Sequence, residues 1–219
     1  MGMAKTKLPK KDEQVIRSFN LHDVRAGEEE STIEGHAAVY NQKTTIGNWF
    51  YEVIERGAFD SCDFDDVLFC VNHDLRKIPL ARSRRNNGNS TMQLSVDEKG
   101  LFIKADLDTE GNTDAKNLHS AVKRGDIDGM SFIFYVDEER WADMDSDMPT
   151  RYITKIKTVR EVSAVTFPAY AGTDINARDK QALDNAKLAL DNARSEELDN
   201  SKNELELLRL KNKNKGLVK

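Results

Sequence analysis

The sequence changes character at residue 176, and this change limits where a hydrophobic core can form. Phe, Trp, Tyr and Pro are absent from residues 176–219, and Gly occurs there only at Gly216. Every aromatic residue of the chain therefore lies before residue 176. Because large apolar side chains dominate protein cores, we expect the globular part of the protein to be built from the earlier segment.

Residues 176–219 are predicted to form a long charged helical tail with a thin apolar stripe. The apolar residues follow the a/d spacing of a coiled coil with one slip: Leu183, Ala186, Leu190, Ala193, Leu198, Leu205 and Leu208. A single helix of this kind cannot form a core. We expect it to dock on a partner or to remain loosely ordered.

The remaining composition argues against several classes of function. The formal net charge of −5 provides no global basic field for nucleic acid. No apolar run approaches the roughly 18 residues that a membrane span needs, and the N-terminus lacks the apolar stretch of a signal peptide. We therefore expect a soluble protein that stays where it is made, with neither nucleic acid nor membrane as a partner.

The two cysteines, Cys62 and Cys70, are too few for a disulfide framework. No second Cys/His pair stands near them at zinc-finger spacing. We interpret them as reduced thiols of a cytosolic protein and expect no metal or other cofactor.

Residues 1–14 are Lys-rich and are predicted to be flexible, and residues 15–175 are predicted to form the main domain. Period-two alternation and turn signals predict strands at 33–40, 92–96, 101–107, 130–136 and 152–167, the second and third forming a hairpin. A short helix is expected at 113–124, capped by Thr113 and stopped by Gly125. Many strands and few helices indicate an α+β, β-rich fold with a closed or half-closed barrel.

His73 is the first candidate for chemistry. It follows the short apolar run 69–71, so its imidazole is expected at the rim of a sheet, within reach of both core and solvent. Histidine exchanges a proton near neutral pH without a large perturbation, which suits a general base. The alternative is a surface histidine in a turn.

Ser131 is the second candidate, at the start of a very hydrophobic strand that follows the turn 125–129. Alternation places Met130 and Phe132 on one face of the strand and Ser131 on the other. A hydroxyl held on a rigid strand can act as a nucleophile, or it can simply bond to its own backbone. The turn has no P-loop lysine, so it is not a phosphate-binding loop.

Glu161 is the third candidate. In a regular strand Val159, Glu161 and Ser163 share one largely apolar face, where a carboxylate needs a partner. A histidine N–H is a suitable partner, because the pairing would fix the tautomer and stabilise the imidazolium. An ion pair with an arginine or a lysine is an open alternative, and Ser163 is an alternative polar partner on the same face.

A metal-dependent hydrolase using His36, His73 and Asp74 is a further alternative. These residues lack a recognised ligand spacing such as H-E-x-x-H, so the sequence disfavours it.

The sequence resembles the prohead protease family of tailed bacteriophages over residues 15–175. The resemblance rests on five blocks in order: GHAAVYN (35–41), ERGAF (55–59), NHD (72–74), GMSF (129–132) and EVSAVTFPAY (161–170). The family is distantly similar to the herpesvirus capsid-maturation proteases. The resemblance implies a serine endopeptidase with an antiparallel β-barrel flanked by helices.

The resemblance also implies roles for individual residues, with His73 as the base and Ser131 as the nucleophile. Herpesvirus relatives use a second histidine as the third member, whereas this sequence offers Glu161 at the comparable block. His119 precedes Ser131 and does not fit that order. Backbone amides, with Arg160 as a helper, are expected to hold the oxyanion.

By the same resemblance, the protein works inside the immature capsid, the prohead, in the host cytoplasm. Its implied partners are the major capsid protein with its scaffold segment, and its implied substrates are scaffold or coat-protein extensions and the protease itself. The resemblance allows a homo-oligomer and gives residues 176–219 a role as a scaffold- or capsid-interaction segment. The alternative is a non-catalytic capsid assembly or scaffold protein with the same barrel.

Overall fold

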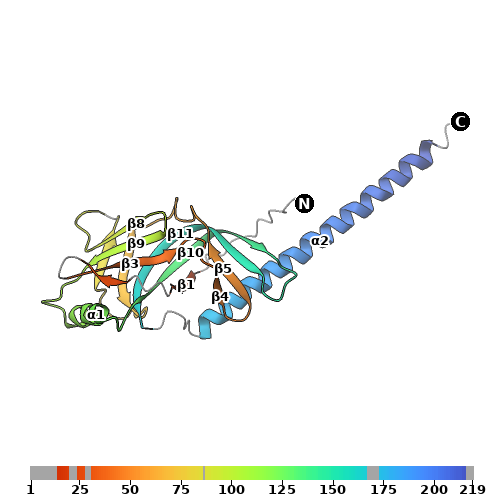
Figure 1. The fold of residues 1–219 in the computed structure, drawn as a ribbon. Helices are drawn as coiled ribbons and strands as arrows, with labels where there is room; N and C mark the ends of the chain where they lie inside the picture. Colours follow the sequence, from red (N-terminus) through yellow and green to blue (C-terminus); the bar gives the residue numbers. More distant parts are fainter. Residues whose placement is uncertain (1–13, 20–23, 28–30, 86, 167–172, 216–219) are drawn as a thin grey trace. The chain divides into compact units, whose positions relative to one another are not determined.

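The structure, a computed structural model, describes residues 14–19, 24–27, 31–85, 87–166 and 173–215 (Figure 1). The described residues divide into two compact units, with the boundary between residues 178 and 179. The predicted flexible segment 1–14 lies outside the described residues except for Gln14, which begins the first strand.

The described residues form eleven strands and two helices. In chain order they are β1 (Gln14–Phe19), β2 (Arg25–Ala26), β3 (Thr32–Val39), β4 (Thr44–Ile46), β5 (Phe50–Ile54), β6 (Asp66–Val71), β7 (Ala81–Arg84), β8 (Met92–Val96), β9 (Gly100–Asp106), α1 (Thr113–Arg124), β10 (Gly129–Ala142), β11 (Thr150–Val165) and α2 (Thr173–Lys215). The β-rich α+β class is confirmed, as is the hairpin of β8 and β9.

The strands form two sheets. The larger has the order β1-β10-β11-β5-β4, with β6 paired to β11 and β7 paired to β6; the smaller has the order β2-β3-β9-β8. The long strand β11 is central to the larger sheet. It pairs antiparallel with β10 along one side and parallel with both β5 and β6 along the other.

The predicted antiparallel barrel is wrong as a description of this pairing. Among the described residues no ladder joins the two sheets, and two of the strand pairs are parallel. Period-two alternation reports which face of a strand is buried, but it carries no information on the direction of the neighbouring strand. The number of strands therefore could not distinguish a closed barrel from two packed sheets.

The main hydrophobic core draws on both sheets and on α1. Met130, Phe132 and Phe134 point into it from β10, as alternation predicts, and the two phenylalanine rings stack with their centroids 4.4 Å apart. Ser131 and Ile133 are also buried but lie on the other face of the strand. This second buried face carries the candidate residues.

Helix α1 occupies the predicted residues but uses a different cap. Asn112, not Thr113, is the N-cap, and its side-chain oxygen accepts hydrogen bonds from the backbone N–H groups of Asp114 and Ala115. Thr113 is the first helical residue. Gly125 ends the helix as predicted, in the left-handed conformation with φ of 76°.

Helix α2 begins at Thr173, before residue 176 at which the sequence predicts the tail to start. Of the helices in the described part of the chain, none combines the length and the apolar character needed to cross a membrane.

A β-bulge at Arg160 changes which residues of β11 share a face. Ile133 of β10 pairs with Glu161, and the next residue, Phe134, pairs with Val159, so Arg160 has no partner in the ladder. Val159 therefore lies in the main core, whereas Glu161 faces the opposite side. The expectation that Val159 and Glu161 share a face was wrong, because regular alternation does not continue through a bulge.

Buried ion pairs fasten the edge strand β1 to the middle of the larger sheet. The Arg17 guanidinium makes two hydrogen bonds to the Glu52 carboxylate of β5, at 2.5 and 2.9 Å. Arg151 of β11 lies 3.4 Å from the same carboxylate and also pairs with Glu139. Burial raises the pKa of Glu52, but the two guanidinium groups outweigh it and the net pKa is lowered. Glu52 is therefore ionised in the folded protein.

We predict that Glu52→Ala lowers the free energy of unfolding by about 3–5 kcal/mol, because it leaves two buried guanidinium groups without their shared partner. Since the folded pKa of Glu52 is lowered, the contribution is present above the ordinary glutamate pKa and is lost as the pH falls through the folded value. Urea unfolding followed by circular dichroism at neutral and acid pH measures both effects.

The matched control is Asp66→Ala, which removes the solvent-exposed ion pair with Arg82. That change should cost less than about 1 kcal/mol. Equal losses for the two variants would contradict the structural role given to Glu52.

Candidate active site

Three neighbouring strands bring the candidate residues to one place. On β10 and β11, Ser131 pairs with Ser163 and Ile133 pairs with Glu161. The parallel strand β6 lies on the other side of β11 and ends at Val71, two residues before His73. Residues far apart in the sequence thus meet on one face of the larger sheet.

The His73 imidazole lies between a hydroxyl and a carboxylate. Its Nε2 is 2.6 Å from Oγ of Ser131, and its Nδ1 is 2.5 Å from Oε2 of Glu161. Both distances are in hydrogen-bonding range. The structure therefore brings all three predicted residues together, in the order hydroxyl, imidazole, carboxylate.

The turn after β6 holds the imidazole in position. Asn72 and His73 both have left-handed backbone conformations, with φ of 50° and 57°. The Asn72 side chain hydrogen-bonds to Thr166, and the backbone N–H of Asn72 donates to the carbonyl of Ala164 at 3.0 Å. Two successive non-glycine residues in this conformation are strained, and such strain persists only where the surroundings impose it. The turn is therefore built to place His73.

Ser163 is hydrogen-bonded to both His73 and Glu161. Its hydroxyl donates a hydrogen bond to Oε1 of Glu161 and accepts one, at 2.9 Å, from the backbone N–H of His73. Ser163 is fully buried. The sequence offered Ser163 as an alternative polar partner on the face of Glu161. In the structure Ser163 and Glu161 are hydrogen-bonded to each other, so both belong to the site.

The backbone of β1 also reaches the site. The Ser131 hydroxyl is 2.9 Å from the carbonyl oxygen of Arg17, to which it can donate. A hydroxyl carries one proton, so the Arg17 carbonyl and Nε2 of His73 compete for it. Nothing in the sequence around Arg17 indicated this contact, because it depends on the pairing of β1 with β10.

The alternatives for His73 and Glu161 are at odds with this arrangement. The His73 side chain is 19% exposed and bonded through both ring nitrogens, unlike a free surface histidine. Glu161 is 1% exposed, and among the described residues its partners are an imidazole and a hydroxyl rather than a guanidinium or an ammonium. The carboxylate is positioned to orient the imidazole.

Arg160 makes no hydrogen bond or ion pair with His73, Ser131 or Glu161 among the described residues. It is exposed and lies at the bulge, and its charge adds to the effect of Arg82 and Arg84, which lower the pKa of Asp66. The expectation that Arg160 assists an oxyanion stays a prediction.

The residues of the metal alternative are not brought together. His36 is 3.0 Å from Asp97, whereas His73 is engaged by Ser131 and Glu161. In the ranges that the structure describes, no three His, Cys, Asp or Glu side chains form a group that could hold a metal ion.

The thiols do not compete with Ser131 as nucleophiles. Both cysteines are free thiols, and Cys70 of β6 is in register with Ser163 of β11. Burial, and then the charges of Glu161 and Asp74, raise the pKa of Cys70 to about 12. Burial likewise raises the pKa of Cys62 to about 12. Because the thiolate is the reactive form, neither is activated near neutral pH.

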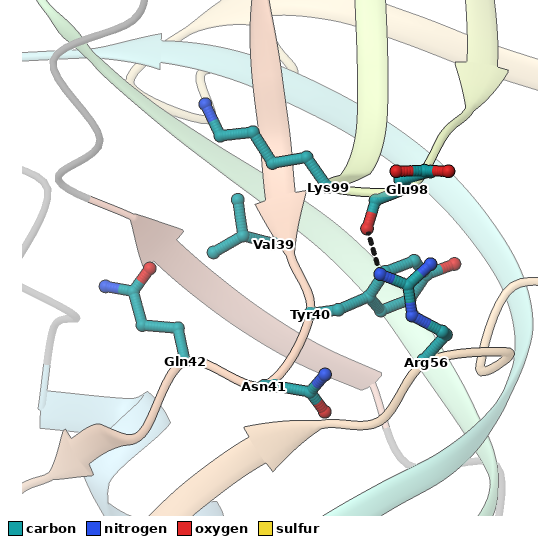
Figure 2. Close-up of a pocket in the computed structure, with 7 residues that line it drawn as sticks. All are labelled: Val39, Tyr40, Asn41, Gln42, Arg56, Glu98 and Lys99. Atoms are coloured by element: carbon teal, nitrogen blue, oxygen red, sulfur yellow. Dashed lines mark hydrogen bonds between the residues drawn. The ribbon is translucent and has the colours of Figure 1, made fainter.

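Two of the sequence blocks meet at a separate hollow of about 360 Å³ (Figure 2). Figure 2 shows Arg56 of the second block lying across the Tyr40 ring of the first, with its guanidinium donating to the Glu98 carbonyl at 2.7 Å. None of His73, Ser131 and Glu161 lines this hollow. These contacts join the segments that follow β3 and β5, and they do not involve His73, Ser131 or Glu161.

The sequence matches the family described as Caudovirus prohead serine protease over residues 18–187, which is most of the chain. The chain belongs to this family. It is also similar to the prohead protease of Enterobacteria phage HK97, with 31% identity over 140 residues. That alignment covers 62% of this chain and 55% of the phage HK97 protein, so the chain spans about half the length of this relative.

The family match includes the segments that carry His73, Ser131 and Glu161. No solved structure matches this chain, and the expected similarity to herpesvirus capsid-maturation proteases stays a prediction.

Proposed function

We propose that this protein is a serine endopeptidase with Ser131 as nucleophile, His73 as general base and Glu161 as the residue that orients the base. One observation carries the proposal: the His73 ring joins Ser131 Oγ to the Glu161 carboxylate through its two nitrogens, at 2.6 and 2.5 Å. This is the arrangement that activates a serine for acyl transfer. Membership of a serine protease family supports the same conclusion.

The proposed reaction begins when Nε2 of His73 takes the Ser131 proton and Oγ attacks the scissile carbonyl carbon. The Glu161 carboxylate accepts the Nδ1–H hydrogen bond and stabilises the imidazolium. The imidazolium then protonates the leaving amine, and the acyl-enzyme ester forms. A water deprotonated by His73 hydrolyses this ester and restores the serine. The steps require no cofactor.

We propose that the substrates are extensions of the major capsid protein or of its scaffold, and the protease itself. The family description and the name of the phage HK97 relative both point to the prohead, the immature capsid, as the place of action. The proposal places this prohead in the host cytoplasm. In this proposal residues 15–175 form the protease domain, residues 1–14 a flexible basic N-terminus, and residues 176–219 a segment that contacts scaffold or capsid.

Removing the nucleophile or the base should abolish cleavage. We expect Ser131→Ala and His73→Ala each to lower the cleavage rate by about 10⁴–10⁶-fold while leaving the fold intact. Glu161→Gln should cost less, about 10²–10⁴-fold, because the amide oxygen can still accept the hydrogen bond from Nδ1–H. A gel time course of each purified variant, with circular dichroism as the folding control, measures this. Unchanged self-trimming in Ser131→Ala would favour the non-catalytic assembly protein.

Ser163 should act on the rate through Glu161 and His73. Ser163→Ala removes a hydrogen bond to a charged group, so we expect kcat to fall about 10–100-fold with little change in KM. Ser163→Thr keeps a hydroxyl and should recover part of the loss. Steady-state kinetics on one peptide substrate measures both variants. An equal loss in the two variants would show that Ser163 matters for packing and not for orientation.

The tail should act in assembly and not in the chemistry. Deleting residues 176–219 should leave peptide cleavage within about twofold and abolish incorporation of the protease into proheads, since the apolar stripe is the proposed contact with scaffold. Purified proheads probed for the protease measure incorporation. Normal incorporation of the shortened chain would remove the tail from the proposal.

A further inference from the structure

A second hollow, of about 260 Å³, lies between the turn that carries His73 and helix α1. Its walls are mostly apolar, and they come from the end of β6, the turn, the helix and the segment before β10: Val71, Ile78, Leu80, Leu118, Ala121 and Ile127. Pockets for whole small molecules occupy about 300–1,000 Å³, so this one suits a single side chain.

The hollow is lined by residues that stand close to members of the triad in the chain or in the sheet. Val71 and Asp74 line it and flank His73 in the chain, and Ile127 lines it just before the strand that carries Ser131. Cys70 lines it as well and pairs in register with Ser163. The hollow is therefore near the segments that carry His73 and Ser163.

The charged groups at its rim are already paired. Asp74 accepts a hydrogen bond from the Arg76 guanidinium at 2.9 Å, and the Lys77 ammonium lies 3.1 Å from the Asp114 carboxylate. The second of these pairs links the turn to α1 across the rim. With both carboxylates engaged, the walls favour an uncharged apolar side chain over a charged one.

The turn also exposes apolar surface beside the hollow. Leu75 is 54% exposed and Ile78, which lines the hollow, is 85% exposed. Both are large apolar side chains on one turn, and a bound peptide can cover such exposed surface. Burying one aliphatic side chain against the apolar walls and these exposed side chains would lower the free energy of the complex.

We propose that this hollow is the substrate subsite that receives one aliphatic side chain (Leu, Ile or Met) of an extended peptide, next to the bond that Ser131 attacks. The inference rests on the proposed function and adds its substrate class. It makes Ala121 and Ile127 specificity-determining residues, since both line the hollow and neither takes part in the hydrogen bonds that join His73, Ser131 and Glu161.

Cleavage of a random peptide mixture, with the products sequenced by mass spectrometry, tests the subsite. The wild type should enrich aliphatic residues at a single position near the cleaved bond. Ala121→Phe fills the hollow and should lower kcat/KM for aliphatic peptides about tenfold or more, shifting the preference at that position to Ala and Gly. Ile127→Ala enlarges the hollow and should shift the preference to Phe and Tyr.

The matched control is Lys116→Phe, which adds the same ring on an exposed site of α1 outside the hollow and should leave the preference unchanged. Labelling of Ser131 by a small fluorophosphonate should continue in every variant, which reports a folded and reactive site. Cleavage without an aliphatic preference, or a preference that neither subsite variant alters, would overturn the subsite and leave the protease standing. A wild type that neither cleaves nor labels would overturn both.

Discussion

The parallel pairing of β6 with β11 is the constraint on which the candidate site depends. It aligns Leu68 with Glu161 and Cys70 with Ser163, so that the chain leaving β6 turns directly over the polar face of β11. The antiparallel neighbour β10 then supplies Ser131 from the other side. A shift of β6 by one residue along β11 would reverse the faces of its side chains and carry His73 away from the carboxylate.

The polar groups on this buried face stabilise one another. A buried carboxylate and hydroxyls without partners would cost several kcal/mol, but here Glu161, Ser163, Ser131 and His73 form a continuous hydrogen-bonded series. The series continues to β1 through the Arg17 carbonyl, while the Arg17 side chain is held by Glu52. Arg17 thus connects the site, through its carbonyl, to the buried ion pairs that hold the edge strand β1.

The strained turn and the apolar hollow give the site its surroundings. The left-handed backbone at Asn72 and His73 fixes the imidazole, and the residues that follow form one wall of the proposed substrate subsite. The proposed base and one wall of the proposed subsite therefore belong to one short segment. Membership of the prohead serine protease family is consistent with a site of this kind.

The sequence by itself was sufficient for the local features. Alternation along β10 placed Phe132 in the core and Ser131 on the other face, and the glycine stop of α1 was correct, because both depend on neighbouring residues alone. Residue type and local context made His73, Ser131 and Glu161 candidates, and the blocks of the family resemblance implied roles for His73 and Ser131. The cap at Asn112 was missed because Thr113 beside it is also a good capping residue.

The tertiary structure alone decided what depends on distant pairing. The two parallel ladders on β11, the bulge that separates Val159 from Glu161, and the contact of the Arg17 carbonyl with Ser131 have no local signature. Each arises from hydrogen bonds between backbones that lie far apart in the chain, and the apolar pattern of one strand does not specify the direction or register of its neighbour. For that reason the sequence could name the members of the site, while only the folded chain could bring them within hydrogen-bonding distance.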